Sequence, residues 1–399
     1  MNRRLIICAD RSFPRGDAGA NRILFMAKAL QETGWDVFVI SIGRNEEKYY
    51  DRSCECYVYE GVKYKNIDVS SNRFFRMVQH NFLDGKNAVK MMQSLNISSD
   101  DVIMLYSSLY SFSSAVISFA NSTKCKVACD IVEWHQPFQF KGGERGLRYK
   151  AYKKFFEELV PKTKNVIVIS ECLDKHFSSV GCHTTVIPIY VDTDNRKSWH
   201  KEIDSSHLNL IYPGNPYKKD DLFSMLQAIE MLDDVEKEYV RFHLTGVNKS
   251  LLYSSIPGNE KLLDALVDRG TVLIHSWMEY DELLKLYQKI DFALLARPVN
   301  KVTEANFPSK VPELMSKGIP VITNRVGDIV QYLDDGEDAI LYDEPTAESC
   351  KKAIQRAIGL ANEERIGLSK KAFENAELKF NYHLCSGKLD GFFSKMRWE

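Results

Sequence analysis

One loop of the sequence carries two lysines directly before a predicted helix. The segment YPGNPYKKDD (212–221) follows a predicted strand, and Gly214 with the proline two residues later forms a turn. Lys218 and Lys219 come next, followed by two aspartates of the kind that begin a helix. The helix dipole disfavours cations at this end. Two lysines here therefore indicate that the loop holds an anion, with solvated surface lysines as the alternative.

A second loop, ARPVNKVTEANFPSKVPELMSKGIPVITN, also places a cation at a helix start. It follows the buried strand DFALLAR, which ends at Arg297. Pro308 is predicted to be the first residue of a helix, with Ser309 and Lys310 in its first turn. The amides and the lysine of that turn could bind a phosphate. Glu313 lies a turn further on, where its carboxylate could accept both hydroxyls of a ribose, although a lone glutamate is more often a solvated surface residue.

The first half of the chain has two further loops whose residues could do chemistry. The loop 14–19 joins a strand to a helix, and its glycines, Gly19 among them, would let a phosphate approach backbone N–H groups. A plain strand-to-helix connection is the alternative. In ACDIVEWHQPFQFKGG, His135 follows a strand end, with Asp130 and Glu133 nearby in the sequence. A histidine so placed is either a catalytic candidate or a structural residue.

The elements that must position these loops alternate between short apolar strands and helices. The predicted strands are LIICA, WDVFVISI, DVIMLYS, KVACDIV, NVIVIS, LNLIYPG, VRFHLTG, TVLIHSW, DFALLAR, PVITN and AILYD. Right-handed strand–helix–strand crossovers give parallel sheets. We therefore predict an α/β protein with two doubly wound Rossmann-like domains, over 1–195 and 206–375, and a last helix within 376–399 that packs back on the first. Ligands of such sheets bind beyond the carboxyl ends of the strands, so the domains would face each other across a cleft.

Composition narrows the class of protein. The chain has 399 residues, 44% of them hydrophobic and 27% charged, which is typical of a globular protein. The formal net charge of -1 argues against nucleic acid as a partner. Residues 1–200 carry 28 basic and 22 acidic side chains, and the remainder 25 and 32, so the first half is expected to meet something anionic.

Targeting signals and cysteines point to the cytoplasm. No apolar run approaches the roughly 20 residues of a membrane span. The first apolar stretch ends at Asp10, which is too short for a signal peptide. The nine cysteines include no C-x-x-C pair, and we expect them to be free thiols in a reducing compartment.

Together the quoted segments resemble the retaining glycosyltransferases of the GT-B fold, glycosyltransferase family four. Within that family they look most like bacterial enzymes that build capsule, O-antigen lipopolysaccharide or exopolysaccharide repeats. The most specific stretch is NFPSKVPELMSKGIPVITN, supported by DIVEWHQP, NVIVISECL, IPIYVD and YPGNPYKKDDL. The resemblance implies a nucleoside-diphosphate sugar as co-substrate and a saccharide acceptor, often lipid-linked. No cofactor is expected. Lysines are expected to replace the divalent cation that other glycosyltransferases use.

The resemblance also assigns roles to individual positions. Lys219 falls where the family places a lysine against the leaving diphosphate. His135 falls in the acceptor-facing cleft, where it would orient a hydroxyl, and Glu313 would bind the ribose. The predicted donor-binding residues are Gly19, Gly214, Asn215, Lys218, Arg297, Pro308, Ser309, Lys310 and Glu313.

Two positions depart from the family's pattern. Asn215 stands where the family often has an arginine. The family's E-x(7)-E motif would put its first glutamate at Ala305, and the adjacent Glu304 is the candidate for that catalytic carboxylate. These departures raise one alternative, a non-catalytic GT-B subunit that supports an active partner. A sugar-nucleotide epimerase, which can share the fold and needs no acceptor, is the other.

A basic segment predicts peripheral membrane binding. Residues 141–164 carry eight basic and three acidic side chains, interleaved with apolar and aromatic residues from Leu147 to Phe156. An anionic bilayer attracts such segments. We therefore expect the chain to bind the inner face of the cytoplasmic membrane, beside a lipid-linked acceptor. The alternative is a solvated helix that covers its own sheet.

Overall fold

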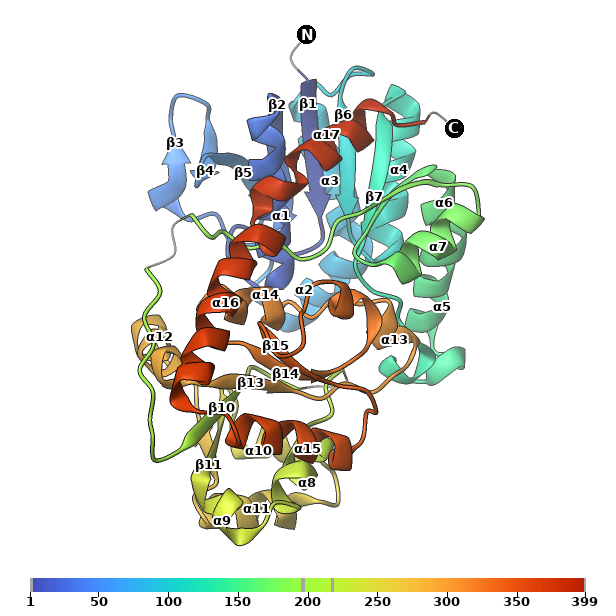
Figure 1. Cartoon of the computed structure of the whole chain (residues 1–399). Coiled ribbons are helices and arrows are strands. Elements are labelled where there is room, and N and C mark those ends of the chain that lie inside the picture. Colours follow the sequence, from blue (N-terminus) through green and yellow to red (C-terminus); the bar gives the residue numbers. More distant parts are fainter. Residues whose placement is uncertain (1–2, 195–197, 217–218, 398–399) are drawn as a thin grey trace. The chain divides into compact units, whose positions relative to one another are not determined.

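The chain forms two compact units in a computed structural model that describes residues 3–194, 198–216 and 219–397. Unit 1 comprises Met1–Tyr190 together with Tyr382–Glu399, and unit 2 comprises Val191–Asn381 (Figure 1). The chain therefore leaves unit 1 after its first half and returns to it with its last residues. In the described part of the chain, no helix combines the length and the apolar character that crossing a membrane requires.

The sheet of unit 1 has the strand order β3-β4-β5-β2-β1-β6-β7-β8-β9. Its pairs are parallel, except that β4 runs antiparallel to both β3 and β5. The strands are β1 (Arg3–Ala9), β2 (Trp35–Ile42), β3 (Tyr50–Asp51), β4 (Cys56–Tyr59), β5 (Val62–Ile67), β6 (Val102–Tyr106), β7 (Lys126–Ile131), β8 (Asn165–Val168) and β9 (His183–Val186). The strand β1 lies between β2 and β6, so the strand order reverses at this point. In open α/β sheets, such a reversal is where ligands bind.

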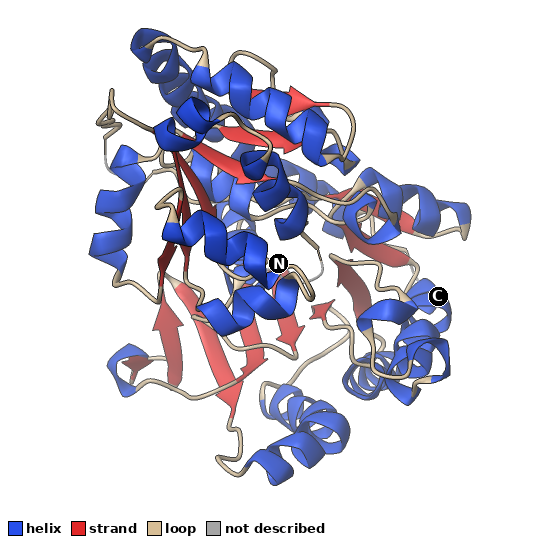
Figure 2. Ribbon diagram, turned by 90° about the horizontal axis from the view of Figure 1, so that it is seen from below, coloured by secondary structure: helices blue, strands red, loops and turns tan. Residues whose placement is uncertain are grey.

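Helices lie on both sides of this sheet (Figure 2). They are α1 (Ala18–Glu32), α2 (Arg73–Val78), α3 (Asp84–Ser94), α4 (Tyr110–Thr123), α5 (Leu147–Lys154), α6 (Val160–Lys162), α7 (Glu171–Ser179) and α17 (Ser386–Ser394). Two π-helical turns continue α2 and α5, namely η2 (Gln79–Leu83) and η5 (Phe155–Leu159). The short 3-10 turns are η1 (Glu47–Tyr49), η3 (Pro137–Gln139), η4 (Gly143–Arg145) and η7 (Tyr382–Cys385).

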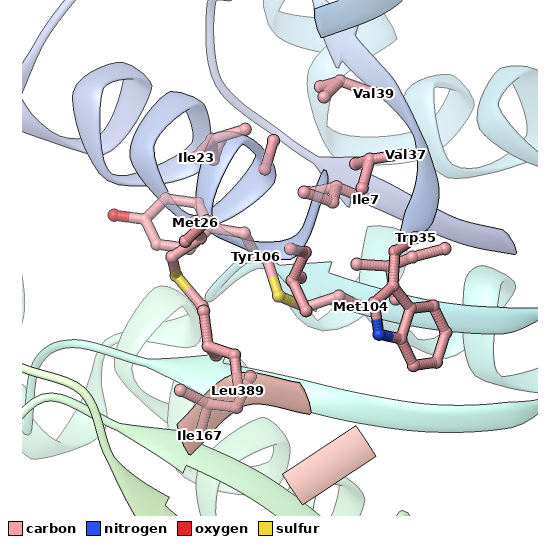
Figure 3. Packing of buried hydrophobic residues seen from close by; sticks show 14 of the residues in the cluster. Ile7, Ile23, Met26, Trp35, Val37, Val39, Met104, Tyr106, Ile167 and Leu389 are labelled. Carbon is pink, nitrogen blue, oxygen red and sulfur yellow. The ribbon is translucent and has the colours of Figure 1, made fainter. Parts of the chain in front are cut away.

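The core of unit 1 lies between the sheet and the helices α1 and α17. Ile23 and Met26 of α1 pack over Val37 and Met104 of the sheet, and Leu389 of α17 belongs to the same buried cluster (Figure 3). The helix α1 begins where the Asp17 side chain accepts hydrogen bonds from the first amides of the helix. That cap fixes the loop after β1, where the sequence predicts a ligand.

The sheet of unit 2 is parallel throughout, with the order β12-β11-β10-β13-β14-β15. The strands are β10 (Leu208–Pro213), β11 (Val240–Thr245), β12 (Val272–His275), β13 (Phe292–Leu295), β14 (Val321–Asn324) and β15 (Ala339–Tyr342). Most of their residues are buried, which explains why they read as unbroken apolar runs. The order reverses between β10 and β13, so the loops after these two strands form the expected ligand site of this unit.

The helices of unit 2 complete a second doubly wound layer structure. They are α8 (Leu222–Glu230), α9 (Asp234–Tyr239), α10 (Lys249–Ser255), α11 (Glu260–Asp268), α12 (Tyr280–Lys289), α13 (Lys301–Glu304), α14 (Lys310–Met315), α15 (Ala347–Ile358) and α16 (Asn362–Phe380), with the 3-10 turn η6 (Gly327–Gln331). The predicted fold class, an α/β protein of two Rossmann-like domains with parallel sheets, is confirmed. The helix predicted to start at Pro308 starts two residues later, at Lys310.

Candidate active site

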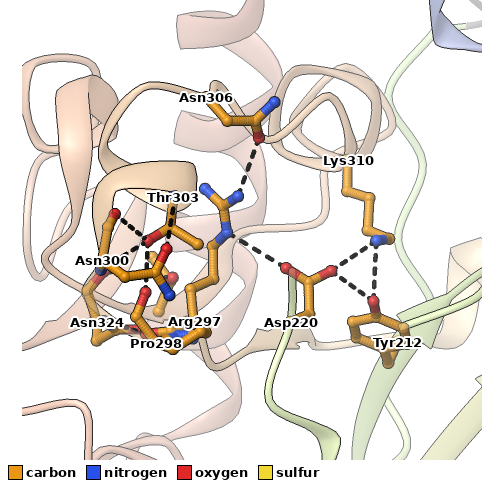
Figure 4. A network of polar contacts seen from close by, with 10 residues as sticks. Tyr212, Asp220, Arg297, Pro298, Asn300, Thr303, Asn306, Lys310 and Asn324 are labelled. Carbon is orange, nitrogen blue, oxygen red and sulfur yellow. Dashed lines mark hydrogen bonds and ion pairs between the residues drawn. The ribbon is translucent and has the colours of Figure 1, made fainter. Parts of the chain in front are cut away.

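The centre of the candidate site in unit 2 is the carboxylate of Asp220, which lies in the loop after β10. Its Oδ1 accepts a hydrogen bond from Arg297 Nε at 3.2 Å. Its Oδ2 accepts one from Lys310 Nζ at 2.8 Å and one from the Tyr212 hydroxyl at 2.5 Å (Figure 4). The Asp220 side chain is only 7% exposed. Two loops that are distant in the sequence thus meet on one buried carboxylate.

The electrostatics of this cluster keep Asp220 ionised. Burial alone would raise the pKa of its carboxyl, but the positive charges of Lys310 and Arg297 outweigh burial and hold the pKa below its ordinary value. Arg297 is itself buried, whereas Lys310 keeps a quarter of its side chain exposed. Lys310 is therefore the member of the cluster that a ligand can reach most readily.

Further hydrogen bonds fix Arg297 at the end of β13. Its Nη2 donates to Asn306 Oδ1 at 2.9 Å, and its backbone N–H donates to Asn324 Oδ1 at 2.8 Å. Asn324, at the end of β14, donates back to the Arg297 carbonyl at 2.9 Å. These bonds tie the carboxyl ends of neighbouring strands together and give the cluster a rigid base.

The other predicted donor residues of unit 2 lie around this cluster. Gly214 adopts a positive φ of 78°, as its turn requires, and donates its N–H to the Thr245 carbonyl at 2.8 Å. Lys219 is half-buried and immediately precedes Asp220, whereas Asn215 is exposed. Lys218 lies outside the described residues.

The remaining three predicted donor residues, Pro308, Ser309 and Glu313, lie in the helix α14 or in the turn before it. Pro308 and Ser309 form the turn that leads into the helix, and the Val311 N–H donates to the Pro308 carbonyl at 3.1 Å. Glu313 is exposed on α14, one turn after Ser309. Although the residue reaches the surface, its desolvated surroundings raise the pKa of its carboxyl to about 7, against the opposing charges of Lys310 and Lys317.

Glu304 and Ala305 occupy different environments at the end of α13. Ala305 is fully buried, whereas Glu304 is exposed. Successive residues of a helix point about 100° apart, so the Glu304 carboxylate does not take the direction of the Ala305 methyl group. A Cβ on Gly327 would lie 3.2 Å from the Glu304 carbonyl, which shows how closely η6 packs on this turn. Glu304 thus faces solvent beside the donor loops.

Comparison with known proteins relates part of unit 2 to a family of glycosyl transferases. Residues 207–359 match the family model described as glycosyl transferases group 1. They include β10, β13, α14 and every member of the Asp220 cluster. No curated protein matches the chain by sequence.

Solved structures match nearly the whole length of the chain. A glycosyltransferase from Rickettsia africae is 14% identical, with a TM-score of 0.68 and 99% of each chain covered. A sucrose-phosphate synthase from Thermosynechococcus elongatus is also 14% identical, with a TM-score of 0.70 over 99% of each chain. The Anabaena protein HepE, in complex with UDP-glucose, is 12% identical, with a TM-score of 0.66 over 98% of this chain and 99% of HepE. At these identities the likeness shows a shared fold, the GT-B fold.

Outside the residues that match this family, His135 lies in a small aromatic pocket of unit 1. Its Nδ1 is 3.3 Å from Glu133 Oε2, and its ring meets Phe140 and Tyr152 edge-on. The Tyr152 hydroxyl accepts a hydrogen bond from the backbone N–H of His135 at 3.0 Å and donates one to the Glu133 backbone carbonyl at 3.2 Å. These contacts fix the imidazole beside a cavity of about 30 Å³.

Asp130 and Gly19 have structural partners in unit 1. Asp130 receives two hydrogen bonds of 2.8 Å from the buried guanidinium of Arg22, and it lines the same small cavity as His135. The Gly19 N–H donates to Asp17 Oδ1 at 2.9 Å. A Cβ on Gly19 would lie 2.9 Å from the Tyr106 hydroxyl, so a larger residue would require neighbouring side chains to shift. The Gly19 amide thus takes part in the cap of α1.

Sequence reasoning missed Asp220 and Tyr212. Both aspartates after Lys219 were interpreted as helix-start residues, but only Asp221 caps α8, through a 3.0 Å hydrogen bond from the Ser224 N–H. One signal was available in the sequence, because a helix needs one such cap and the second aspartate required another explanation. Tyr212 gave no signal, since it ends an apolar strand.

Proposed function

We propose that the chain is a retaining glycosyltransferase that moves a sugar from a nucleoside-diphosphate sugar to a hydroxyl of a lipid-linked saccharide in surface polysaccharide synthesis. The observation that carries the proposal is the cluster of Asp220, Arg297 and Lys310 at the strand-order reversal of unit 2, within the residues that match the group 1 glycosyl transferases. HepE, which shares the fold, is seen with UDP-glucose.

The residues around the cluster suit the departure of a nucleoside diphosphate. Cleavage of the bond to the anomeric carbon leaves additional negative charge on the β-phosphate, which positioned cations and N–H groups can stabilise. Lys219 and Lys310 lie in the two loops that begin beside this site, and the amides of Ser309 and Lys310 lead into α14. Lysines in these places would perform the task of a divalent cation, so the proposed reaction needs no metal.

The remaining roles follow from exposure and from the proposed chemistry. The exposed carboxylate of Glu313 would accept the ribose hydroxyls, and Glu304 would contribute the carboxylate near the anomeric carbon. His135, fixed by Glu133 and Tyr152, would orient the attacking hydroxyl. Attack on the face from which the diphosphate leaves would retain the anomeric configuration. We place the reaction in the cytoplasm, at the inner face of the cytoplasmic membrane.

A thermal-shift screen over nucleoside diphosphates and their sugars tests donor binding. A ligand present at 100 times its dissociation constant stabilises the folded protein by about 2.7 kcal/mol, so a true donor should stand out from the other nucleotides. The donor found this way is then incubated with saccharide acceptors, and the anomeric configuration of the product is read by NMR. Absence of any stabilising nucleotide would contradict the proposal.

A non-catalytic subunit is the second candidate, favoured by the buried Ala305 at the position of the family's first glutamate. Such a subunit would bind a nucleotide without turning it over. The two candidates differ in one measurement, because only the enzyme releases nucleoside diphosphate when both donor and acceptor are present.

A further inference from the structure

The helix α2 and the turn η2 expose an unusual number of aromatic side chains. Phe74 and Phe75 of α2 are 63% and 62% exposed, and Phe82 of η2 is 70% exposed. The Asn72 side chain begins this helix by accepting hydrogen bonds from the N–H groups of both α2 phenylalanines. Several large apolar side chains exposed on one short segment mark a site of interaction. We refer to residues 73–83 as the aromatic segment.

A polar cavity of about 590 Å³ adjoins the aromatic segment. Arg73 and Arg76 line it from α2, Arg148 from α5, and Asp10 and Gly43 from the loops after β1 and β2. The cavity therefore lies at the carboxyl ends of the strands of unit 1, where ligands of such sheets bind.

The three arginines of this cavity leave its carboxylates to other partners. Asp17 pairs with Arg11 at 3.1 Å, Asp10 accepts a hydrogen bond from Ser107 at 2.9 Å, and Asp84 accepts one from Gln79 at 2.9 Å and lies 3.5 Å from His80. Within residues 3–194, 198–216 and 219–397, Arg73, Arg76 and Arg148 form no ion pair with a carboxylate. A cavity with such unpaired guanidinium groups is suited to a phosphate, which guanidinium binds through two parallel hydrogen bonds.

We propose that this cavity binds the phosphate group of an amphiphilic lipid phosphate whose hydrocarbon chain lies on the aromatic segment. Arg73 and Arg76 flank Phe74 and Phe75 on one helix, so the charged and the apolar parts of one ligand would contact neighbouring residues. If the proposed transfer reaction is correct, this ligand is the lipid-linked acceptor. The site itself would bind a lipid phosphate whether or not transfer takes place.

The basic segment 141–164 fits this ligand less well. Its aromatic residues Tyr152, Phe155 and Phe156 are buried, with exposed fractions of 6%, 1% and 1%. Lys153 faces Glu157 at 3.8 Å, and Lys154 lies over the ring of Tyr110. These three side chains pack in the core of unit 1 and do not reach the surface, whereas Leu147 of the same segment is 83% exposed. Membrane binding by the segment as a whole stays a prediction. The segment contributes Arg148 to the cavity.

Vesicle co-sedimentation of the full chain tests the proposal. Vesicles of phosphatidylcholine alone are compared with vesicles that also contain phosphatidic acid, whose headgroup is a phosphate monoester. We expect binding to the second kind only, weakening as ionic strength rises. Each arginine near an anionic surface contributes a factor of about five, so Arg73→Gln with Arg76→Gln should weaken binding about thirtyfold.

Two further variants make the test specific. Arg52→Gln with Arg325→Gln removes two exposed arginines elsewhere, changes the net charge equally, and should leave vesicle binding unchanged. Phe74→Ser with Phe75→Ser should abolish binding to vesicles while circular dichroism stays unchanged. Equal loss in both arginine pairs would overturn the proposal, because binding would then follow net charge alone.

Free anions provide the last arm of the experiment. Inorganic pyrophosphate is titrated against the full chain and against the phenylalanine variant by calorimetry. Tight pyrophosphate binding by both the unaltered chain and the phenylalanine variant, without vesicle binding by either protein, would show that the cavity binds a free anion. That result would overturn the proposal that the ligand is a lipid phosphate. Vesicle binding is measured without any nucleotide sugar, and donor binding without any vesicle. Failure of one proposal is therefore distinguishable from failure of the other.

Discussion

At the scale of single residues, Asp220 determines how much positive charge the donor loops present. One buried carboxylate neutralises part of the charge of both Arg297 and Lys310. Removing the carboxylate would leave a buried guanidinium without its anion, which costs more than the pair contributes. Asp220 therefore has a structural task first, and it sets the charge of the site as a consequence.

We expect Asp220→Asn to lower the free energy of unfolding by about 3 kcal/mol, since Arg297 would keep its burial but lose its counter-charge. Urea denaturation followed by circular dichroism measures the change. Asp221→Asn is the matched control, because asparagine caps a helix as well as aspartate does and should cost little. Similar losses in the two variants would show that the cluster contributes no more than the cap.

Lys219 is expected to act on the leaving diphosphate. If it stabilises charge that develops only as the glycosidic bond breaks, its removal must slow turnover more than it weakens donor binding. Lys219→Ala should bind the donor within several-fold and turn over at least ~100-fold more slowly, whereas Lys218→Ala should lose much less. Steady-state kinetics of the two variants checks this. A dead Lys218→Ala with an active Lys219→Ala would reverse the assignment.

At the scale of elements, three neighbouring strands of unit 2 align a buried polar chain. His243 of β11 contacts His275 of β12 at 3.0 Å through its Nδ1 and Asn209 of β10 at 3.2 Å through its Nε2. Burial, then the neighbouring His275 and Arg241, lowers the pKa of His243 to about 4. The imidazole is therefore neutral in the folded chain at neutral pH.

This lowered pKa predicts an acid-sensitive sheet. The unfolded chain protonates His243 near its ordinary pKa of about 6.5, whereas the folded chain does so only near pH 4. The contribution of His243 to the free energy of unfolding is thus fully present above pH 6.5. It decreases by about 3 kcal/mol as the pH falls from 6.5 to 4. Urea midpoints over this range measure the slope. His243→Gln, which does not titrate, should flatten it, and an unchanged slope would contradict the assignment.

Strands that are buried on both faces could be predicted from the sequence, and partly exposed ones could not. LIICA and DFALLAR are unbroken apolar runs because helices cover both sides of β1 and β13. The strands β3, β4, β5 and β9 were not predicted. Two of them, β4 and β9, are mostly half-exposed and only four residues long, so their composition resembles a loop.

The site could be predicted only in part, because its key contacts are distant in the sequence. Lys310 and Arg297 were named from their loops, since each follows a strand or begins a helix. Their common partner Asp220 lies 77 residues before Arg297 and 90 before Lys310, and no local pattern relates them. Strand order brings them together, and strand order is not visible in a single sequence.

At the scale of the whole molecule, the end of the chain completes the core of its beginning. After Asn381 the chain returns to unit 1, where Leu389, Phe392 and Phe393 of α17 are buried in the cluster that contains Ile23. Full burial of such a side chain contributes about 1.5–3 kcal/mol. The three together are comparable to the ~5–15 kcal/mol that holds a typical protein folded. Unit 1 therefore depends on residues that lie about 190 positions after the rest of its sequence.

This dependence predicts that one substitution in α17 weakens unit 1 and spares unit 2. Leu389→Ala should cost about 3 kcal/mol, since Leu389 is fully buried and its removal leaves a cavity. Leu384→Ala is the matched control, because Leu384 is 51% exposed only five residues earlier. Hydrogen exchange read by mass spectrometry should show faster exchange of β1 and β6 in Leu389→Ala, with β10 and β13 unchanged. Equal acceleration in both units would mean that the two unfold together, and the last helix would then support the whole chain and not unit 1 alone.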